Sequence, residues 1–441
     1  MSVTLGIYYI SPWIRWDRGP NAPDQAILVD MSTPRFYFFF IEIWPQEIYY
    51  VTGLLIIAAL ALFLATSLLG RVWCGYACPQ TVWTDLFLVV ERFFEGDRAA
   101  RIRLDRAAWN VDKLARRAGK HVVWLIIAVC TGGAWVFYFA DAPTLVADLV
   151  AFEAPTVSYS FIAGLTATTY LMGGFAREQV CTFMCPWPRI QAAMFDEDTL
   201  IVGYREHRGE PRKPYRKGDS WEGRGSCIDC KMCVVVCPMG IDIRDGLQLE
   251  CISCALCIDA CNGIMDRVGQ PRGLIGYDTA SGLRRKTEGE TGRLRLIRAR
   301  TVIYATLIAL VGAIMLVTLI IRSPLDVNVL RDRNPLFVAL SGGEIRNGFA
   351  VKILNKHHED RTFRFAVTGL SGAKISIIGM PGAGEHPRLA VGPDRLRSYR
   401  VFVTVSRESL AGPSTPIRFV LIDTTDGRTV YHDSTLRGPG R

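Results

Sequence analysis

The sequence predicts a multi-domain protein with an α-helical transmembrane bundle, an inserted cysteine-rich cytoplasmic domain and a C-terminal β-sandwich. Three observations predict this fold class. Four apolar runs contain no Asp, Glu, Lys or Arg, eight of the 13 cysteines lie between residues 227 and 261, and short alternating apolar and polar runs follow residue 326. The chain has 441 residues, which is enough for two or three domains.

The four apolar runs are predicted membrane spans. They cover residues 48–69, 122–140, 154–176 and 301–321, and each is close to the ~20 residues that a helix needs to cross a bilayer. A buried core helix can have the same composition, but four such runs in one chain favour spans. We therefore expect a transmembrane region in residues 1–198 and a last transmembrane helix in residues 299–322.

The distribution of charge predicts the orientation of these spans. Residues 91–120 hold nine Lys and Arg, residues 141–153 hold none, and Arg295, Arg298 and Arg300 precede the last run. By the positive-inside rule, residues 199–298 form a cytoplasmic domain and residues 323–441 a periplasmic one, in a bacterial inner membrane crossed several times. The net charge of +9 is thus a topology signal. Without a basic patch interleaved with aromatic residues, we expect no nucleic-acid partner.

The N-terminal segment is shorter than the other apolar runs. Residues 1–14 are uncharged but are interrupted by Pro12. Because they lack a positively charged start they do not match a signal peptide, and we interpret them as a partial first span or an interfacial segment. Residues 36–40 with Trp44 are typical of an aromatic belt at the outer interface.

The cysteines lie on the side of the membrane where thiols stay reduced. Twelve of the 13 are at or within the predicted cytoplasmic portion, Cys130 lies inside a span, and residues 323–441 contain none. Structural disulfides belong on the oxidising side. We therefore interpret these residues as thiols kept for ligation or redox chemistry.

Eight cysteines form two copies of the spacing C-x2-C-x2-C-x3-C, which start at Cys227 and at Cys251. Three thiolates at i, i+3 and i+6 wrap one cubane cluster, whereas zinc ligands usually come in two separate pairs. The fourth ligand of each cluster comes from the other copy. The pattern predicts a 2[4Fe–4S] ferredoxin-like domain with the ligand sets Cys227, Cys230, Cys233 and Cys261, and Cys251, Cys254, Cys257 and Cys237.

Two adjacent clusters without a recognisable substrate pocket indicate electron transfer. No Gly-rich nucleotide loop and no Ser/His/Asp set can be assigned in the sequence, and nothing in it identifies the electron donor.

Two further pairs of cysteines follow the pattern Cys-x3-Cys-Pro, each just after an apolar run. They are Cys74 with Cys78 and Cys181 with Cys185. The proline favours a turn at the second cysteine and a helix directly after it. This internal repeat predicts that the four thiols lie together at the cytoplasmic ends of their spans.

Three interpretations of this thiol quartet stay open. Four soft sulfurs suit Cu(I), two dithiols can cycle with disulfides, and small cysteines can simply pack. The repeated spacing and membrane depth favour the first two, a copper or dithiol redox site. The lone Cys130 is interpreted as a packing residue.

The C-terminal region is predicted to be a small β-sandwich. Residues 348–354, 362–367, 398–405 and 417–422 are strand-like runs with turn residues between them, and about seven strands are expected. The Cys…Trp…Cys pattern of antibody domains is absent from the sequence, so only the architecture is predicted. His357 and His358 are interpreted as part of a polar turn rather than as metal ligands.

The whole arrangement resembles the cytochrome c oxidase accessory proteins, the CcoG, FixG or RdxA family. The resemblance includes "GRVWCGYACPQTVWTDLF" and "GGFAREQVCTFMCPWPRIQAAMFDEDTL", and it extends over residues 11–30, 39–55, 137–145 and 237–277. It implies a membrane-bound dicluster iron–sulfur protein with a periplasmic immunoglobulin-like C-terminal domain. Family members act in maturation of cbb-type cytochrome c oxidase, and the role assigned to them is reduction of Cu(II) to Cu(I).

The resemblance also implies transient copper as a ligand, and oxidase assembly factors or copper chaperones as partners. Two other functions remain alternatives. One is a quinol-linked respiratory subunit that feeds a periplasmic reductase, since membrane ferredoxins of that kind share the Cys-x3-Cys-Pro motif. The other is a non-redox assembly scaffold in which the clusters only stabilise the fold.

Overall fold

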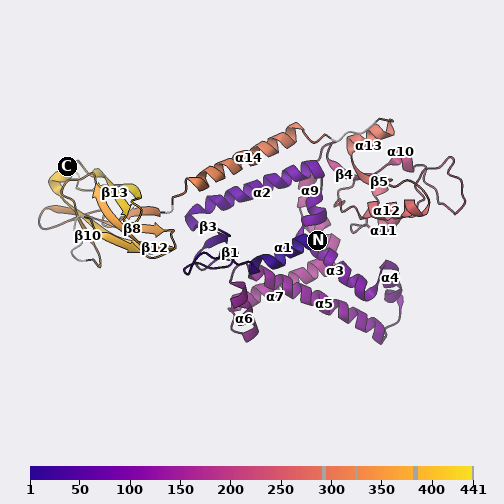
Figure 1. Ribbon diagram of the computed structural model, residues 1–441, viewed down its shortest axis with the longest axis horizontal. Coiled ribbons are helices and arrows are strands. Elements are labelled where there is room, and N and C mark those ends of the chain that lie inside the picture. The colour runs from indigo at the N-terminus through magenta and orange to yellow at the C-terminus, as the bar shows by residue number, and fades with distance from the viewer. Residues whose placement is uncertain (291–294, 324, 381–385, 440–441) are drawn as a thin grey trace. The chain divides into compact units, whose positions relative to one another are not determined.

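The computed structural model describes residues 1–290, 295–323, 325–380 and 386–439 (Figure 1). The chain divides into two compact units. The first comprises Met1–Arg15 and Gln25–Val317, and the second comprises Trp16–Asp24 and Thr318–Arg441.

Long apolar helices dominate the first unit. Three are long and apolar enough to cross a membrane, Pro45–Leu69, Val111–Val136 and Ala299–Ile320, and a pair bent by 94°, Ala142–Ala151 with Thr156–Met184, makes a fourth if it is one span. In the most apolar 18-residue segment of each of the first three helices, only 17%, 44% and 0% of the residues are buried. The exposed apolar side chains form the surface expected of helices that lipid covers.

Local capping explains where these helices begin and end. Helix α2, Ile48–Leu69, covers the predicted run and ends at Gly70. Gly70 has φ +63°, and a Cβ there would lie 2.4 Å from the carbonyl oxygen of Leu200. Helix α5, Val111–Val136, begins before the predicted residue 122 because the Asn110 side chain accepts the backbone N–H of Lys113.

The third predicted run is not one regular helix. Helix α7, Thr156–Leu171, is followed by the π-helical turn η4, Met172–Ala176, by the short helix α8, Arg177–Gln179, and by a second π-helical turn, η5, Val180–Met184. Helix α6, Ala142–Ala151, precedes it across the 94° bend.

Helices α2 and α14, Ala299–Ile320, lie side by side (Figure 1). A Cβ on Gly53 would meet the Met315 sulfur at 2.5 Å, and the rings of Phe63 and Tyr304 are 6.1 Å apart. The small residue therefore allows the two helices to approach closely, as small residues do in membrane helix pairs.

A second helical group surrounds Trp124 of α5. Its ring stacks on Phe87 of α3, Pro79–Glu95, with centroids 5.2 Å apart, and its Nε1–H donates to the Phe87 carbonyl at 3.0 Å. Gly173 and Gly174 of η4 lie against these two rings. The group fixes α3, which follows Cys78, relative to the helix that leads to Cys181.

The N-terminal segment forms a short helix rather than a full span. Helix α1, Ser2–Ile10, and the turn η1, Ser11–Trp13, cover residues 2–13. The Tyr8 hydroxyl donates to the Thr131 carbonyl of α5 at 2.7 Å. The segment is therefore held against α5.

Residues 27–43 form a small sheet that the sequence pattern did not predict. Strands β1, Ile27–Asp30, β2, Arg35–Phe38, and β3, Ile41–Ile43, pair antiparallel in that order. Phe38 and Phe40 remain exposed. The aromatic residues therefore belong to a β-meander and its turn.

The cysteine-rich region is folded around a two-stranded sheet. Strand β4, Leu200–Tyr204, pairs antiparallel with β5, Ile275–Thr279, so the ends of the region are joined. Between and after them lie α10, Glu206–Gly209, α11, Met232–Val235, η6, Ile243–Asp245, α12, Leu256–Arg267, and α13, Ala280–Thr287. Val202, Met265, Leu274 and Ile275 form its apolar core together with Cys227, Cys233 and Cys261.

The second unit is a sandwich of two antiparallel sheets. One has the order β10-β12-β8-β6 with β7 paired to β8, and the other has the order β11-β9-β13-β14. Nine strands form in the described part: β6, Leu325–Arg331, β7, Val338–Ala339, β8, Glu344–Asn355, β9, Arg361–Thr368, β10, Lys374–Ile377, β11, Arg388–Val391, β12, Arg395–Ser406, β13, Ser414–Asp423, and β14, Thr429–Arg437. Four of them, β8, β9, β12 and β13, cover the runs predicted from the sequence.

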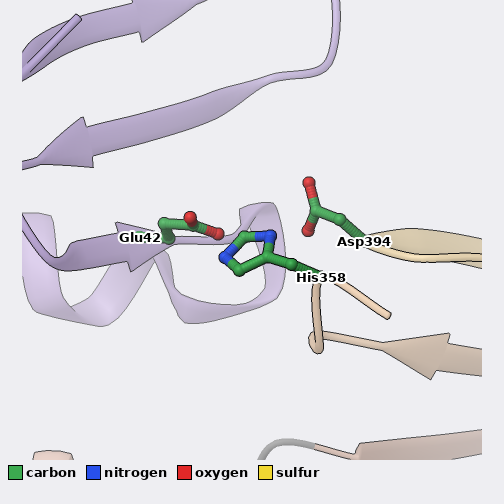
Figure 2. Close-up of side chains that lie close together, drawn as sticks. All are labelled: Glu42, His358 and Asp394. Carbon is green, nitrogen blue, oxygen red and sulfur yellow. The ribbon is translucent and has the colours of Figure 1, made fainter. Parts of the chain in front are cut away.

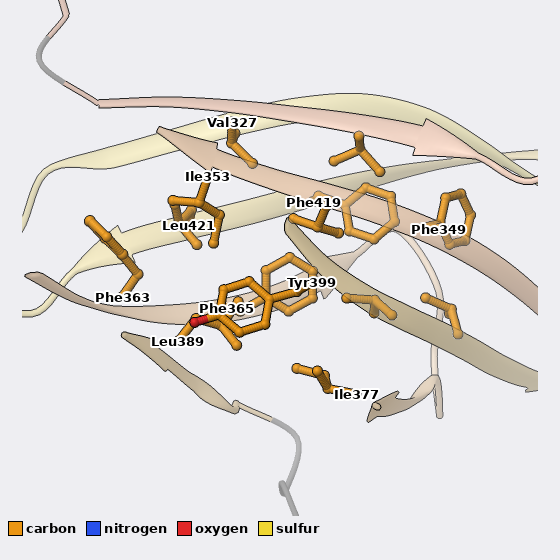
Figure 3. Close-up of a cluster of buried hydrophobic side chains, with 14 of the residues drawn as sticks. Val327, Phe349, Ile353, Phe363, Phe365, Ile377, Leu389, Tyr399, Phe419 and Leu421 are labelled. Atoms are coloured by element: carbon orange, nitrogen blue, oxygen red, sulfur yellow. The ribbon is translucent and has the colours of Figure 1, made fainter. Parts of the chain in front are cut away.

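The sandwich has its own hydrophobic core. Alternate residues of β8 are buried, as a strand with one buried face requires. Phe349 and Phe419 meet edge to face at 4.9 Å, and Phe365 stacks on Phe419 at 5.8 Å (Figure 3). This core makes the unit compact without disulfides.

Candidate functional site

Four cysteines from both copies of the spacing line one cavity of the cysteine-rich region. They are Cys227, Cys230, Cys233 and Cys261. The remaining lining includes the apolar side chains of Ile264, Met265, Leu274 and Ile275. Four soft sulfur donors around an otherwise largely apolar space suit an iron–sulfur cluster.

A second cavity is lined by the other four cysteines of the region, with Cys233 also on its wall. The four are Cys237, Cys251, Cys254 and Cys257. Cys237 thus comes from the first copy of the spacing to the second cavity, and Cys261 comes from the second copy to the first cavity. Apart from Cys233, which lines both cavities, the cysteines divide between the cavities as the two predicted ligand sets do, and four sulfur donors in each fit one cubane cluster. The ligation itself stays a prediction.

The backbone repeats at matching positions of the two cysteine loops. Asp229 and Lys231 have positive φ angles of 50° and 55°, and Ser253 and Ala255 have 56° and 66°. These residues stand two and four positions after Cys227 and Cys251. Left-handed backbone in non-glycine residues costs energy and clusters at functional sites. It also turns successive N–H groups toward one side, which forms a concave site for an anionic group such as an iron–sulfur cluster.

Burial controls the protonation of the cluster cysteines. It raises the pKa of Cys257 to about 12 and that of Cys261 to about 11, because neighbouring apolar groups disfavour the thiolate. Without bound metal, these two thiols are therefore protonated at neutral pH. Binding of iron has to release protons, so assembly of the clusters is coupled to pH.

The two membrane cysteine motifs adopt the same backbone. In each, a π-helical turn precedes the second cysteine: η3, Trp73–Ala77, and η5, Val180–Met184. The Cys78 N–H donates to the Trp73 carbonyl at 2.8 Å, and the Cys185 N–H donates to the Val180 carbonyl at 2.8 Å. Cys78 and Cys185 are then extended before their prolines. π-helical turns occur frequently at functional sites.

The four thiols of these motifs are close enough to act on one another electrostatically. Burial raises the pKa of Cys74 to about 12, with further increases from the charges of Cys78, Cys181 and Cys185 and an opposing effect of Arg71. Cys74 is buried, whereas the other three are partly exposed. Cys74 thus lies within electrostatic reach of the other three thiols of the predicted quartet, which come from two separate motifs. Cys130 is exposed on α5.

Gln191 is a site residue that the sequence did not reveal. It is 0% exposed, accepts the Cys74 Sγ–H at 3.0 Å and donates to the Thr66 hydroxyl at 3.2 Å. It lies in α9, Trp187–Ala192, which follows the second thiol motif. A lone glutamine in a short helix gives no signal in the sequence, because only the fold brings it to Cys74.

The first thiol motif also contacts the second cysteine loop. The Tyr76 hydroxyl donates to the Cys254 carbonyl at 3.4 Å and hydrogen-bonds with the Tyr277 hydroxyl at 2.8 Å. The thiol quartet and the second cavity are thus joined through one short segment.

The two neighbouring histidines of the second unit lie in a turn between β8 and β9. The His357 N–H donates to the Asn355 side chain at 3.0 Å, and its carbonyl accepts the Asp394 N–H at 2.8 Å. Figure 2 shows His358 beside Asp394; the third labelled residue, Glu42, belongs to the other unit. Within their unit this pair supplies fewer ligands than protein zinc sites use.

Three family models match the chain. A "4Fe-4S dicluster domain" matches residues 176–280, a "4Fe-4S binding domain" matches residues 51–95, and the "IG-like fold at C-terminal of FixG" matches residues 315–439. The first contains all eight cysteines of the two cavities and also Cys181 and Cys185. The second contains Cys74 and Cys78.

Full-length relatives are similar to the chain. It is 50% identical to the "Nitrogen fixation protein FixG" of Rhizobium meliloti, over 100% of this chain and 90% of that protein. It is 53% identical to "Protein RdxB" of Cereibacter sphaeroides, over 100% of this chain and 93% of that one. A crystal structure of a FixG-related protein from Vibrio parahaemolyticus is 22% identical, with a TM-score of 0.23, over 26% of this chain and 97% of that one.

These matches extend over the apolar helices, both cysteine regions and the sandwich. The chain belongs to the family of FixG, RdxA and RdxB, and is a membrane iron–sulfur electron-transfer protein with 4Fe–4S domains and a C-terminal immunoglobulin-like domain.

Proposed function

We propose that the protein reduces Cu(II) to Cu(I) at the quartet of Cys74, Cys78, Cys181 and Cys185. The observation that carries the proposal is that Cys74 lies within electrostatic reach of the other three thiols and that the first motif contacts the loop of the second cysteine cavity. Sulfur ligands favour Cu(I) over harder cations. The quartet thus combines a copper-retaining donor set with a nearby redox site.

The eight cysteines of the two cavities would hold one [4Fe–4S] cluster each, in the sets Cys227, Cys230, Cys233 and Cys261, and Cys251, Cys254, Cys257 and Cys237. Bound there, the clusters supply single electrons. Copper is the substrate: each Cu(II) accepts one electron and becomes Cu(I), which the thiol sulfurs retain until a partner removes it.

The proposal includes a setting in the cell. The protein crosses the bacterial inner membrane several times, with the cysteine-rich domain in the cytoplasm and the sandwich in the periplasm, and Cu(I) serves assembly of a cbb-type cytochrome c oxidase through assembly factors or copper chaperones. The charge distribution supports the orientation.

The test is cupric reduction by the purified, cluster-loaded protein in detergent under anaerobic conditions. After reduction with dithionite and removal of the excess, Cu(II) is added, and Cu(I) is measured with bicinchoninate while cluster absorbance is followed. The double variants Cys74→Ser/Cys78→Ser and Cys181→Ser/Cys185→Ser should keep both cluster EPR signals. They should reduce Cu(II) at least about tenfold more slowly, because they have lost the copper-retaining sulfurs.

Cys130→Ser is the matched control, because this thiol is exposed on α5 and belongs to neither motif. It should behave as the wild type. Undiminished Cu(II) reduction in both double variants would contradict the proposal. A wild-type protein that does not react with Cu(II) but is reduced by a quinol would favour the respiratory alternative. Clusters that cannot be cycled between redox states would favour the scaffold.

A further inference from the structure

Arg71 is a buried arginine between the end of α2 and the first thiol motif. It is 2% exposed. Its Nη1 donates to the carbonyls of Leu249 and, at 3.1 Å, Cys251, and its Nη2 donates to the Pro188 carbonyl at 2.9 Å. One guanidinium thus joins the first motif, the segment after the second motif and the second cysteine loop.

The charge of Arg71 lies within electrostatic reach of both redox sites. It interacts with the sulfur of Cys74 in the thiol quartet and with the sulfur of Cys251 in the second cavity. Among the described residues, its Nε–H has no hydrogen-bond acceptor. A buried cation bonded mainly to neutral carbonyls is costly. The carboxylate of Glu250 and, once their thiolates bind metal, the two sulfur sites provide negative charge that offsets this cost.

Gly75, next to Cys74, brings the backbones of the two sites into direct contact. A Cβ at Gly75 would lie 2.8 Å from the Ile252 carbonyl oxygen and 3.4 Å from the Ser253 carbonyl group. Real Cβ atoms essentially never approach a neighbour within 3.0 Å. Any larger side chain therefore has to push the first motif away from the loop of residues 251–254.

The first thiol motif contacts the loop of the second cysteine site rather than the loop of the first. The Tyr76 and Tyr277 hydroxyls hydrogen-bond to each other at 2.8 Å, and each lies 3.4 Å from a carbonyl of this loop, Tyr76 from that of Cys254 and Tyr277 from that of Ser253. The hydroxyl that accepts in the bond between the tyrosines is free to donate to its carbonyl. In the part of the chain that the structure describes, hydrogen bonds from the first thiol motif reach residues 249–254 and none reaches the loop of residues 227–233.

We propose that Arg71 and Gly75 form the junction that couples the thiol quartet to the second cysteine site, the one lined by Cys237, Cys251, Cys254 and Cys257. Gly75 sets the separation of the two sites, and Arg71 is a positioning residue whose charge favours the reduced state of the second site. The proposal rests on the proposed function only in naming Cu(II) as the electron acceptor.

The charge of Arg71 gives a test that needs no copper. A positive charge near a cluster favours its reduced, more negative state, because hydrogen bonds and net charge set cluster potentials. In a redox titration of the loaded full-length protein followed by EPR, Arg71→Gln should lower the reduction potential of one cluster and leave the other unchanged. Arg71→Lys, which keeps the charge, should stay closer to the wild type.

A Cys254→Ser variant, which should lack the EPR signal of the second cluster, shows which of the two signals belongs to that cluster. The signal whose potential shifts in Arg71→Gln should be the same one. Arg298→Gln is the matched control, because Arg298 also bonds to a carbonyl at the end of α2, that of Ser67, at 2.7 Å, but bonds to Asp196 instead of the cysteine loop. It should move neither potential. The role of Arg71 would be overturned if Arg71→Gln shifted the reduction potential of the first cluster alone, shifted both potentials equally, or shifted neither.

The role of Gly75 is tested by two oxidants. Reoxidation of the reduced protein by Cu(II) should slow about tenfold in Gly75→Ala, because a displacement of under an ångström at a reacting site has effects of this size or larger. Reoxidation by ferricyanide, which can reach the clusters directly, should not change. Equal slowing by both oxidants, or no slowing by Cu(II), would overturn the junction. A wild type that does not react with Cu(II) refutes the proposed function instead, while the titration still decides on Arg71.

Discussion

Arg244 shows how one residue ties the first cysteine loop to the rest of its domain. It is 8% exposed, its Nη1 donates to Asp229 at 2.6 Å, and its Nε and Nη2 bond to both oxygens of Asp242 at 2.8 and 2.6 Å. Asp229 stands between Cys227 and Cys230. The hydrogen bonds from Arg244 lower the pKa of both carboxyl groups.

This interaction makes the domain sensitive to acid. A carboxyl group whose pKa is lower in the folded state stabilises the fold above its unfolded pKa, near 4, and that contribution is lost as the pH falls through the folded value. Arg244→Gln should lower the free energy of unfolding by about 2 kcal/mol at pH 7, where charged hydrogen bonds are lost. The difference from the wild type should shrink below about pH 4.

The measurement is the thermal midpoint for loss of cluster absorbance between neutral and acid pH. Arg272→Gln is a control, because its pair with Asp266 lies on the exposed surface of the same region. The thermal midpoint of Arg244→Gln could instead stay below that of the wild type by the same amount down to low pH. This would show that the carboxylates contribute nothing and that the lost stability comes from packing alone.

At the scale of the elements, two short helices explain how ligands cross between the cavities. Cys257 and Cys261 lie one turn apart on α12, yet Cys257 lines the second cavity and Cys261 the first. Cys233 lies on α11 and Cys237 follows it. Because α11 and α12 pack together, α12 supplies predicted ligands to both cavities, and so does the segment formed by α11 and the residues just after it.

This arrangement predicts which cluster each single substitution removes. Cys261→Ser should abolish or convert the EPR signal of the first cluster and leave the second, and Cys237→Ser should do the reverse, because serine oxygen replaces one of four sulfur ligands. EPR of the dithionite-reduced protein, with iron per chain determined, measures both. Loss of the second cluster in Cys261→Ser and of the first cluster in Cys237→Ser would mean that each spacing motif completes its own cluster.

The regular elements were the predictable part of the fold. Charge-free runs predicted α2 and α14 closely, and alternation predicted β8, β9, β12 and β13, because these patterns report burial directly. The start of α5 was missed because its first turns are charged and depend on the Asn110 cap. The sheet of residues 27–43 was missed because an aromatic run fits both a strand and an interfacial belt.

The site was predictable to the extent that sequence spacing carries its geometry. Repeated cysteine spacing predicted which cysteines line each cavity and that Cys74 lies within electrostatic reach of Cys78, Cys181 and Cys185; metal ligation by these residues stays a prediction. Arg71, Gly75 and Gln191 were not predicted, because their partners are between 117 and about 180 residues away in the chain. An arginine at the end of an apolar run is expected for topology alone, so its role as a junction is visible only in the fold.

At the scale of the whole molecule, all cysteines lie outside the sandwich. Residues 323–441 contain no cysteine, while the first unit contains all 13. The sandwich is held by a core that includes Phe349, Phe365 and Phe419 and needs neither metal nor disulfide for cohesion. A domain of this kind can fold in an oxidising compartment, which is the side of the membrane that the charge bias of the flanking segments predicts for it.

The orientation can be tested with one introduced thiol on each side. Thr425 and Lys217 are both exposed, the first in the sandwich and the second in the cysteine-rich region. In spheroplasts, a membrane-impermeant maleimide should label Thr425→Cys, and it should label Lys217→Cys only after permeabilisation, because the positive-inside rule places the basic segments in the cytoplasm. The unmodified protein measures background from the native cysteines. Labelling of Lys217→Cys in intact spheroplasts would contradict the predicted orientation. It would mean that the thiol quartet, together with its copper, lies at the opposite face of the membrane.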